Sequence, residues 1–411
     1  MWARALFAQR PGSAVLLDTK LPLLFFVTMR LHRLVVLIAF IVGLACSRTH
    51  ARAAEDTQLD LANEVLAKVS QKIVPDRHLA IFDMTIEREG KDLLLAGELD
   101  SAQNKQAVLT ALRENGIEAK DRITLLPDKE LGDKVWGIST MSVANGREDP
   151  EQKAELGTQI LMGNVVHVWK RHRGWLLIQS ADGYISWTEH GNLVRCTRAE
   201  ADAWQSSSLL IVTALEEQAV EQPRTGAQPV CDIVLGNLVR KTGEQGKWFL
   251  VELPDGRKGA LPKSAAQDYS VWKKSRHATP EKIEQTARLF MGRPYLWGGN
   301  SPKGMDCSGF CKLVFLMNGI DLNRNASHQA LQGNALSLEN NLADLKKGDL
   351  IFFGHSRGGE RPRVSHVGIY LGNKTFIQSS QRVRISSLDP DSPLFDEQYG
   401  RALIAARRIL P

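Results

Sequence analysis

Cys307 is the residue of this 411-residue chain best placed to act as a nucleophile. It stands in the segment GRPYLWGGNSPKGMDCSGFCKLVFLMNG, where a Gly-rich loop leads through Asp306 into an apolar helix. The unpaired N–H groups and the dipole at a helix N-terminus lower the pKa of a cysteine there, which favours the reactive thiolate. The alternative is a buried structural cysteine, and we assign Cys311, one turn further along, to that class.

A nucleophilic thiol needs an imidazole base, and the base needs a third group to hold its tautomer. In RVSHVGIYLGNKTFIQSS, His366 opens one predicted strand and Gln378 lies on the next. The two side chains share a sheet face only if the connection is the three-residue loop 371–373 or contains an equivalent bulge. His328 and His355 lie in polar segments, where we expect them to be solvated, and His355 is the alternative base.

The elements that position these residues form a predicted domain over residues 279–411. Thr279 caps a helix that has Pro280 at its first position and runs to Phe290. A second helix follows Asp306. Strand-like runs come afterwards, at residues 349–353, 366–371, 375–379 and 402–409. Helices followed by an antiparallel sheet are typical of an α+β domain.

Five motifs follow one another in residues 280–411: PYLWGG, DCSGF, GDLIFF, SHVGIYLG and FIQSS. With these motifs the domain resembles the NlpC/p60 family of peptidoglycan cysteine peptidases. The resemblance implies a papain-like core with Cys307 as nucleophile, His366 as base and Gln378 as the residue that orients the imidazole. Many relatives have His in that third place, but the amide carbonyl of Gln also accepts an imidazole N–H.

An internal repeat with a constant offset of 73 residues occupies the middle of the chain. Gly163-Asn164 matches Gly236-Asn237, and Trp175 matches Trp248. Short strands with Gly-bearing turns predict two small all-β barrels, at residues 128–200 and 201–272, that resemble bacterial SH3-like domains. We expect both Trp residues in the barrel cores.

Two aromatic residues of the first copy, Tyr184 and Trp187, lack counterparts, because Arg257 and Ala260 stand there in the second copy. They are therefore candidates for a role that only the first barrel performs.

With these barrels and the segment RNASHQ after the nucleophile, the chain resembles γ-D-glutamyl-L-diamino acid endopeptidases, which cut murein peptides after L-Ala-γ-D-Glu. The resemblance implies that a set of polar groups binds the free amine of L-Ala: Asp306, Ser308, Tyr295, Ser327 and Tyr184. It also implies an acid in the stretch ELGTQ, where Gly157 stands at the aligned place and Glu155 lies two residues earlier.

Residues 55–127 predict a small α/β domain that resembles the BON-like domains of envelope proteins. Strand-like runs at residues 79–86 and 92–99 are followed by a helix at 105–115 and a third strand at 122–126. We predict no chemistry for this domain.

Residues 1–54 have the pattern of an export signal. A basic stretch at residues 30–33 precedes an apolar run at 34–46, and small residues follow at 51–54. A start at Met29 would give a signal of normal length. We expect export to the periplasm or cell envelope and no stable membrane insertion after cleavage; the alternatives are an uncleaved anchor and a lipoprotein attached through the cysteine that ends the apolar run.

The net charge of +6 comes from this leader, which holds seven Lys or Arg and one acid. The rest of the chain has 45 basic and 45 acidic residues and is therefore neutral overall. Nucleic-acid binding by bulk charge therefore loses its main support. The later cysteines lack the spacing of a zinc site, so no metal or cofactor is expected. Cys196 and Cys231 either form a disulfide or are two small buried residues.

The sequence thus predicts a multidomain protein with an α/β BON-like unit, two SH3-like barrels and a C-terminal α+β papain-like peptidase domain. The predicted reaction is hydrolysis of the γ-D-glutamyl-L-diamino acid bond of murein peptides through a thioacyl-enzyme on Cys307. A preference for free N-terminal L-Ala suits muropeptide trimming or recycling. The alternatives are hydrolysis of intact peptidoglycan stem peptides, acyl transfer, and a catalytically weak wall-binding protein.

Overall fold

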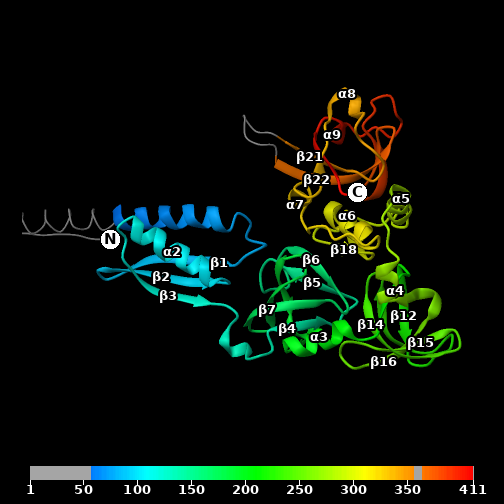
Figure 1. Cartoon of the computed structure of the whole chain (residues 1–411), viewed down its shortest axis with the longest axis horizontal. Helices are drawn as coiled ribbons and strands as arrows, with labels where there is room; N and C mark the ends of the chain where they lie inside the picture. Colours follow the sequence, from blue (N-terminus) through cyan, green and yellow to red (C-terminus); the bar gives the residue numbers. More distant parts are fainter. Residues whose placement is uncertain (1–56, 356–362, 411) are drawn as a thin grey trace, which may run out of the picture. The chain divides into compact units, whose positions relative to one another are not determined.

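The computed structural model describes residues 57–355 and 363–410. The predicted leader and its alternatives lie outside these residues. A helix spans residues 57–73, and the elements that follow are coloured in chain order in Figure 1. Within the described part of the chain, none of the helices is both long and apolar enough to cross a membrane.

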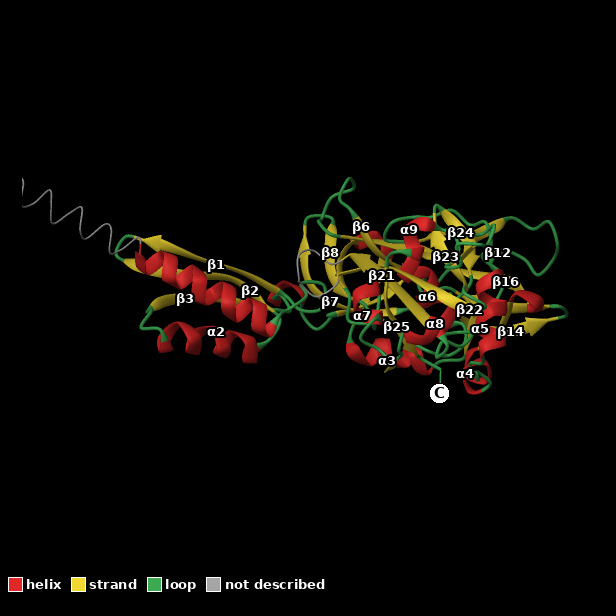
Figure 2. Cartoon of the chain, turned by 90° about the horizontal axis from the view of Figure 1, so that it is seen from above, coloured by secondary structure: helices red, strands yellow, loops and turns green. Residues whose placement is uncertain are grey.

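A small α/β unit comes first, with β1 (Phe82–Glu89), β2 (Asp92–Leu99), α2 (Ala102–Glu114) and β3 (Ala119–Leu125). β1 and β2 form an antiparallel hairpin, and β3 returns parallel to β2 after α2, which lies along this sheet (Figure 2). Val108 and Leu112 are the buried residues of α2, as expected for an amphipathic helix. The resemblance to BON-like domains stays a prediction.

β1 begins three residues later than the strand-like run predicted from Leu79, because the backbone before it is bound by other groups. The carbonyl of His78 accepts a hydrogen bond of 2.7 Å from the N–H of Ile185 in the next domain. The N–H of Ile81 is bound by the side chain of Asp100 at 2.7 Å.

The two repeats fold into sheets with one strand order, and each strand of the first begins 73 residues before its counterpart. The first sheet has the order β10-β4-β7-β8-β9-β5-β6, and the second has β17-β11-β14-β15-β16-β12-β13. The first copy comprises η1 (Lys129–Leu131), β4 (Trp136–Ser139), β5 (Val143–Arg147), β6 (Leu156–Leu161), β7 (Val165–His172), β8 (Trp175–Gln179), β9 (Ile185–Glu189), η2 (His190–Asn192), β10 (Leu193–Cys196) and α3 (Arg198–Ser206). The second comprises β11 (Leu209–Val212), β12 (Glu216–Val220), β13 (Pro229–Val234), β14 (Leu238–Gln245), β15 (Trp248–Glu252), β16 (Lys258–Pro262), η3 (Lys263–Ala265), β17 (Ala266–Asp268) and α4 (Tyr269–Lys274).

Aliphatic side chains fill both barrel cores, such as Ile178 in the first and its counterpart Val251 in the second. The prediction that Trp175 and Trp248 lie in these cores was wrong, because each opens its strand at the barrel rim and is only half-buried. Trp187 has a different role. It packs on a small apolar cluster that joins the α/β unit to the first barrel: Ile81, Leu126, Leu177 and Ile185.

The barrels lie against each other through the matching turn positions of the repeat. The N–H of Leu238 donates to the carbonyl of Met162 at 2.9 Å. Gly163 beside it has φ +80, and a Cβ there would lie 2.2 Å from the Leu238 carbonyl oxygen. Only glycine fits this close approach.

The C-terminal domain has a six-stranded sheet of order β20-β25-β21-β22-β23-β24 with helices around it (Figure 1). Its elements are α5 (Pro280–Arg288), β18 (Asn300–Ser301), β19 (Gly304–Met305), α6 (Cys307–Leu316), α7 (Ala326–Gln329), β20 (Asn334–Ala335), α8 (Glu339–Leu342), β21 (Leu350–His355), β22 (Arg363–Gly372), β23 (Thr375–Ser380), β24 (Arg382–Ser387), α9 (Glu397–Gly400) and β25 (Leu403–Arg408). The predicted helices and the four predicted strands are present, with ends shifted by a few residues.

The apolar cluster around α6 extends beyond this domain. It includes Leu161 from the first barrel and Val234 and Leu235 from the second. A reciprocal pair of buried amides adds to the join: Gln159 N–H donates to Asn300 Oδ1 at 2.8 Å, and Asn300 N–H donates to Gln159 Oε1 at 3.1 Å.

Cys196 and Cys231 are free thiols, so the disulfide alternative does not apply in this structure. Burial raises the pKa of each thiol to about 11. Cys311 is fully buried, as predicted for a structural cysteine.

Candidate active site

Cys307 is the first residue of α6, as the sequence predicted. Asp306 is the N-cap, and its side chain accepts a 2.7 Å hydrogen bond from the N–H of Gly309. The lowered pKa expected from the helix N-terminus is not found: burial raises the pKa of the Cys307 thiol to about 12, and the charge of Asp306 adds to this shift. Hydrogen bonds from the backbone N–H groups of Val367 and Ser308 act in the opposite direction. The Val367 contact shows that the thiol lies beside the residue of β22 that follows His366.

His366 and Gln378 meet across β22 and β23. Ile369 pairs with Ile377, and a register shift after Tyr370 places an extra residue in β22 before the turn. This shift puts both side chains on one face, so the predicted bulged connection is confirmed. His366 Nε2 lies 2.5 Å from Gln378 Oε1.

The amide of Gln378 is fixed in turn, because its Nε2 donates to Ser386 Oγ at 2.8 Å. Gln378 Oε1 is thus the acceptor, and His366 carries its proton on Nε2. The other ring nitrogen, Nδ1, is left unprotonated and able to accept a proton from a thiol.

Burial lowers the pKa of His366 to about 4, although the hydrogen bond to Gln378 raises it. The ring stacks on Tyr399 with centroids 4.5 Å apart. At neutral pH the thiol and the imidazole are therefore both uncharged, and Nδ1 of the ring is free to accept a proton. His355 is exposed at the end of β21, where its strand partner is Arg363.

A buried arginine beside the nucleophile was not predicted. Arg324, the first residue of RNASHQ, binds the Asp306 carboxylate with Nη2 at 2.5 Å and Nη1 at 3.1 Å. Asp306 also accepts from the N–H groups of Gly298 and Gly309 and from the Ser308 hydroxyl. Five donors thus face a carboxylate with about four lone-pair sites. Removal of either charged partner would leave a buried charge uncompensated, at a cost of about 3–5 kcal/mol.

A pocket of about 340 Å³ opens onto Cys307. Tyr184 from the first barrel lines it, together with Tyr295, Ser308 and Ser327 from the C-terminal domain. All the residues predicted to bind the substrate amine therefore line one pocket, including Asp306. The hydroxyl of Ser308 is already engaged, since it donates to Asp306 and accepts from Arg324 Nη1.

Glu148 is a second pocket residue that was not predicted. Tyr184 donates its hydroxyl to Glu148 Oε1 at 3.0 Å. Gly157 lies directly beside the pair, and a Cβ there would be 2.4 Å from Glu148 Oε1 and 2.8 Å from the Tyr184 oxygen. The only feature of the sequence that points to Glu148 is Gly157, which stands where an acid was expected and leaves room for the Glu148 side chain. Glu155, the residue that we considered instead, accepts from Trp297 Nε1 at 2.5 Å.

Three residues of the α/β unit reach the same region. Arg77 and His78 line the pocket, and both bind Glu148. Asp76 lies 2.8 Å from His328 Nε2. The expectation that His328 is solvated was wrong, because the sequence did not indicate that this segment packs on α7.

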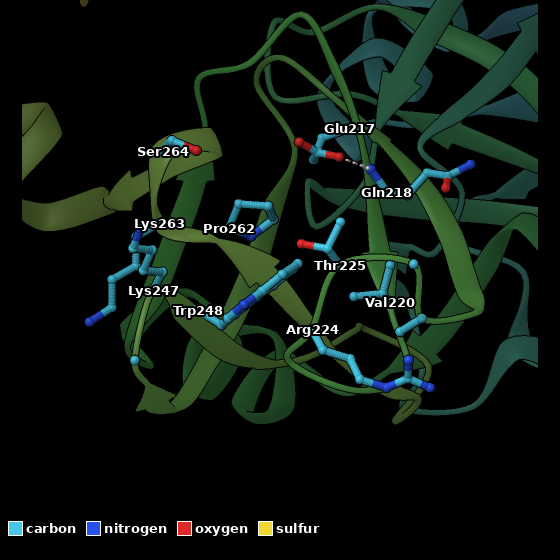
Figure 3. Close-up of a pocket in the computed structure, with 13 residues that line it drawn as sticks. Glu217, Gln218, Val220, Arg224, Thr225, Lys247, Trp248, Pro262, Lys263 and Ser264 are labelled. Carbon is cyan, nitrogen blue, oxygen red and sulfur yellow. Dashed lines mark hydrogen bonds between the residues drawn. The ribbon is translucent and has the colours of Figure 1, made fainter.

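A larger hollow, about 720 Å³, lies in the second barrel (Figure 3). Trp248, Pro262 and Thr225 surround it, and the side chain of Arg224 lies at its edge. No cysteine or histidine is among the residues that line it. The smaller pocket at Cys307 is therefore the candidate active site.

Comparisons with known proteins agree with this choice. Residues 292–403 match the model of the NlpC/P60 family, and residues 146–193 match that of the bacterial dipeptidyl-peptidase Sh3 domain. Dipeptidyl-peptidase 6 of Lysinibacillus sphaericus is 27% identical over 277 residues, which is 64% of this chain and 95% of the relative. A γ-D-glutamyl-L-lysine dipeptidyl-peptidase of Bacillus cereus is 27% identical over 62% of this chain and 76% of the relative.

Among solved structures, an NlpC/P60 family protein from Bacillus cereus matches with a TM-score of 0.58. It is 24% identical, over 67% of this chain and all of that chain, so the likeness supports the fold.

Proposed function

We propose that this chain, whose C-terminal domain is an NlpC/P60 cysteine peptidase domain, hydrolyses the γ-D-glutamyl-L-diamino acid bond of murein peptides that have a free N-terminal L-Ala. The observation that carries the proposal is the shared pocket of Cys307, Tyr184 and Glu148. A nucleophile and an acceptor site for an ammonium group then line the same cavity. The Bacillus cereus relative named for this bond supports the same substrate class.

The proposed chemistry follows from the neutral pair. His366 Nδ1 accepts the thiol proton as the sulfur attacks the γ-carbonyl carbon of D-Glu. The imidazolium then donates this proton to the departing amine of the diamino acid, which leaves a thioester on Cys307. Water activated by the neutral imidazole hydrolyses the thioester and releases the N-terminal dipeptide. Gln378 keeps the ring in the required tautomer throughout.

Glu148 is the proposed partner of the substrate amine. One lone pair of its Oε1 is used by Tyr184, and the phenol oxygen can itself accept an N–H. Asp306 was predicted for this role, but its five donors leave no lone pair for an ammonium. We therefore assign Asp306 and Arg324 to holding the start of α6, and Ser327 and Tyr295 to the pocket wall.

A peptide whose L-Ala amine is an amide lacks the charge that Glu148 would bind. The proposal thus favours muropeptide trimming or recycling in the cell envelope over hydrolysis of intact stem peptides. The test is incubation of the protein with L-Ala-γ-D-Glu-diamino acid peptides, free or N-acetylated, with products followed by mass spectrometry. Release of L-Ala-γ-D-Glu from the free peptide alone is expected. Equal rates on both peptides would point to a general wall hydrolase, and no cleavage would point to a wall-binding protein.

A further inference from the structure

The segment Asp76–Leu79 connects the helix at residues 57–73 to β1, and several backbone contacts hold it. Leu79 N–H donates to the Asp76 carbonyl at 3.1 Å, which closes a turn. The carbonyl of His78 accepts from Ile185 N–H at 2.7 Å, and that of Leu79 accepts from Gln179 Nε2 at 3.3 Å. The first barrel thus fixes the backbone, and the side chains of Arg77 and His78 line the pocket.

Both ring nitrogens of His78 face carboxylate oxygens. Nδ1 lies 2.8 Å from Asp76 Oδ1, and Nε2 lies 3.1 Å from Glu148 Oε2. A neutral imidazole has one N–H, so only the protonated ring donates to both. The ring also stacks on Tyr184, with centroids 4.9 Å apart and planes at 15°. His78 therefore contacts both members of the proposed amine site.

The charges around His78 come from three parts of the chain. Arg77 Nη2 binds Glu148 Oε2 at 3.0 Å, and Asp76 Oδ2 lies 2.8 Å from His328 Nε2 on α7. The cluster thus contains two carboxylates, one guanidinium and two imidazoles. The hydrogen bond to Glu148 raises the pKa of His78, although burial opposes the shift. Burial alone would raise the pKa of Glu148, but its bonds to His78 and Tyr184 and the charge of Arg77 lower it.

We infer that Asp76–His78 is the end wall of the substrate pocket, and that His78 is a positioning residue that holds Glu148 and Tyr184 for the amino group of the substrate. The inference rests on the proposed function and gives the α/β unit a part in substrate selection. His78 and Arg77 bind Oε2 of Glu148 together, which leaves Oε1 turned toward Tyr184 and the pocket.

Protonation of His78 has two opposing effects on an ammonium in the pocket. The N–H bond to Glu148 orders the carboxylate, whereas the positive charge repels the substrate. Arg77 still holds Glu148 when the imidazole is neutral, so the charge effect dominates. The KM for a free-amine peptide therefore falls as the pH rises through the pKa of His78.

Two variants of the full chain separate the effect of the charge on His78 from the effect of its hydrogen bond to Glu148. In His78→Gln the amide keeps an N–H for Glu148 but does not titrate, and His78→Ala loses both. His190→Gln is the control, because His190 is an exposed histidine of the same barrel, outside the pocket. The KM of the wild type for the free peptide is measured from pH 5.5 to 8. At each pH it is divided by the KM of the His78→Gln variant for the same peptide, and this ratio cancels the ionisation of the substrate.

This KM ratio is expected to be about fivefold at low pH and to approach one at high pH. The KM of His78→Ala should exceed that of His78→Gln about tenfold at every pH, with kcat unchanged. The acetylated peptide and the His190→Gln control should show none of these effects. Calorimetric binding of L-Ala-γ-D-Glu to the same proteins repeats the comparison without turnover.

The inference is overturned if the KM ratio does not change with pH, or if His78→Ala alters kcat rather than KM while melting like the wild type. The proposed function fails separately, when the wild type neither cleaves the free peptide nor binds the dipeptide.

Discussion

The two barrels share a strand order and a fixed offset, yet only the first lines the active-site pocket. Tyr184 and Gly157 of the first barrel correspond to Arg257 and Val230 of the second. In the second barrel, Arg257 binds the Val230 carbonyl and the Asp255 carboxylate of its own fold. The glycine turns and the aliphatic core thus specify the barrel, while positions at its rim are free to acquire or lose a function.

The first barrel differs in one further respect, which is the set of domains that it contacts. Its rim lines the same pocket as the nucleophile, and its Glu148 binds both His78 of the α/β unit and Tyr184 of the barrel itself. The corresponding residue of the second copy, Glu221, does not line the hollow of that barrel, and no cysteine lines it either. A duplicated domain is recruited to a site by its neighbours as much as by its own residues.

The largest expected effect comes from replacing the nucleophile, and a matched cysteine of the second barrel serves as the control. Cys307→Ala should reduce turnover by at least about a thousandfold without unfolding the protein, because the thiol is the only proposed nucleophile. Cys231→Ser in the second barrel should leave turnover unchanged. Peptide hydrolysis and thermal melting measure both, and alkylation should label Cys307 before Cys311. Wild-type turnover in Cys307→Ala would end the assignment.

The fall of kcat at acid pH should be caused by His366 of the peptidase domain and not by residues of the barrels. The pKa of His366 is lowered to about 4, and the neutral ring is the base. The value of kcat for the free peptide should therefore be constant above about pH 5.5 and fall roughly tenfold per unit below pH 4. Tyr184→Phe should keep the same limb. Circular dichroism at each pH distinguishes protonation from acid unfolding, and a limb centred near pH 6.5 would contradict the buried neutral imidazole.

Substitution of the matched rim residues tests the comparison directly. Tyr184→Ala should lower kcat/KM for the free peptide about ten- to a hundredfold, since a hydrogen bond near a charge is worth about 1.5–3 kcal/mol. A smaller gain is expected on N-acetylated peptides, because the wall has been opened. Arg257→Ala should change neither rate. Similar losses in both variants would mean that Tyr184 acts through barrel stability.

Exchange of the glycine gives the smallest expected effect. Gly157→Val installs the residue of the second barrel, and its Cβ would push against Glu148 and Tyr184. The KM should rise about tenfold as the pair is displaced, whereas Val230→Gly in the second barrel should affect stability only. An unchanged KM in Gly157→Val would show that Glu148 is not needed in its present position.

The sequence predicted the parts of the site that depend on local pattern. Cys307 follows a helix cap, and the His366–Gln378 contact follows from strand register and a bulge. Glu148 and Arg324 were missed, because their roles arise only when distant segments pack together. The half-buried Trp248 shows a related limit, since an apolar residue at a strand end is equally compatible with a core and with a rim.

The apolar cluster around α6 has a consequence for how the chain unfolds. It takes in Leu161, Val234 and Leu235 from the barrels, and the amides of Gln159 and Asn300 are buried against each other. A peptidase domain cut away from the barrels would expose this apolar surface to water and lose the paired amides of Gln159 and Asn300. Barrels and peptidase should therefore melt in one cooperative transition.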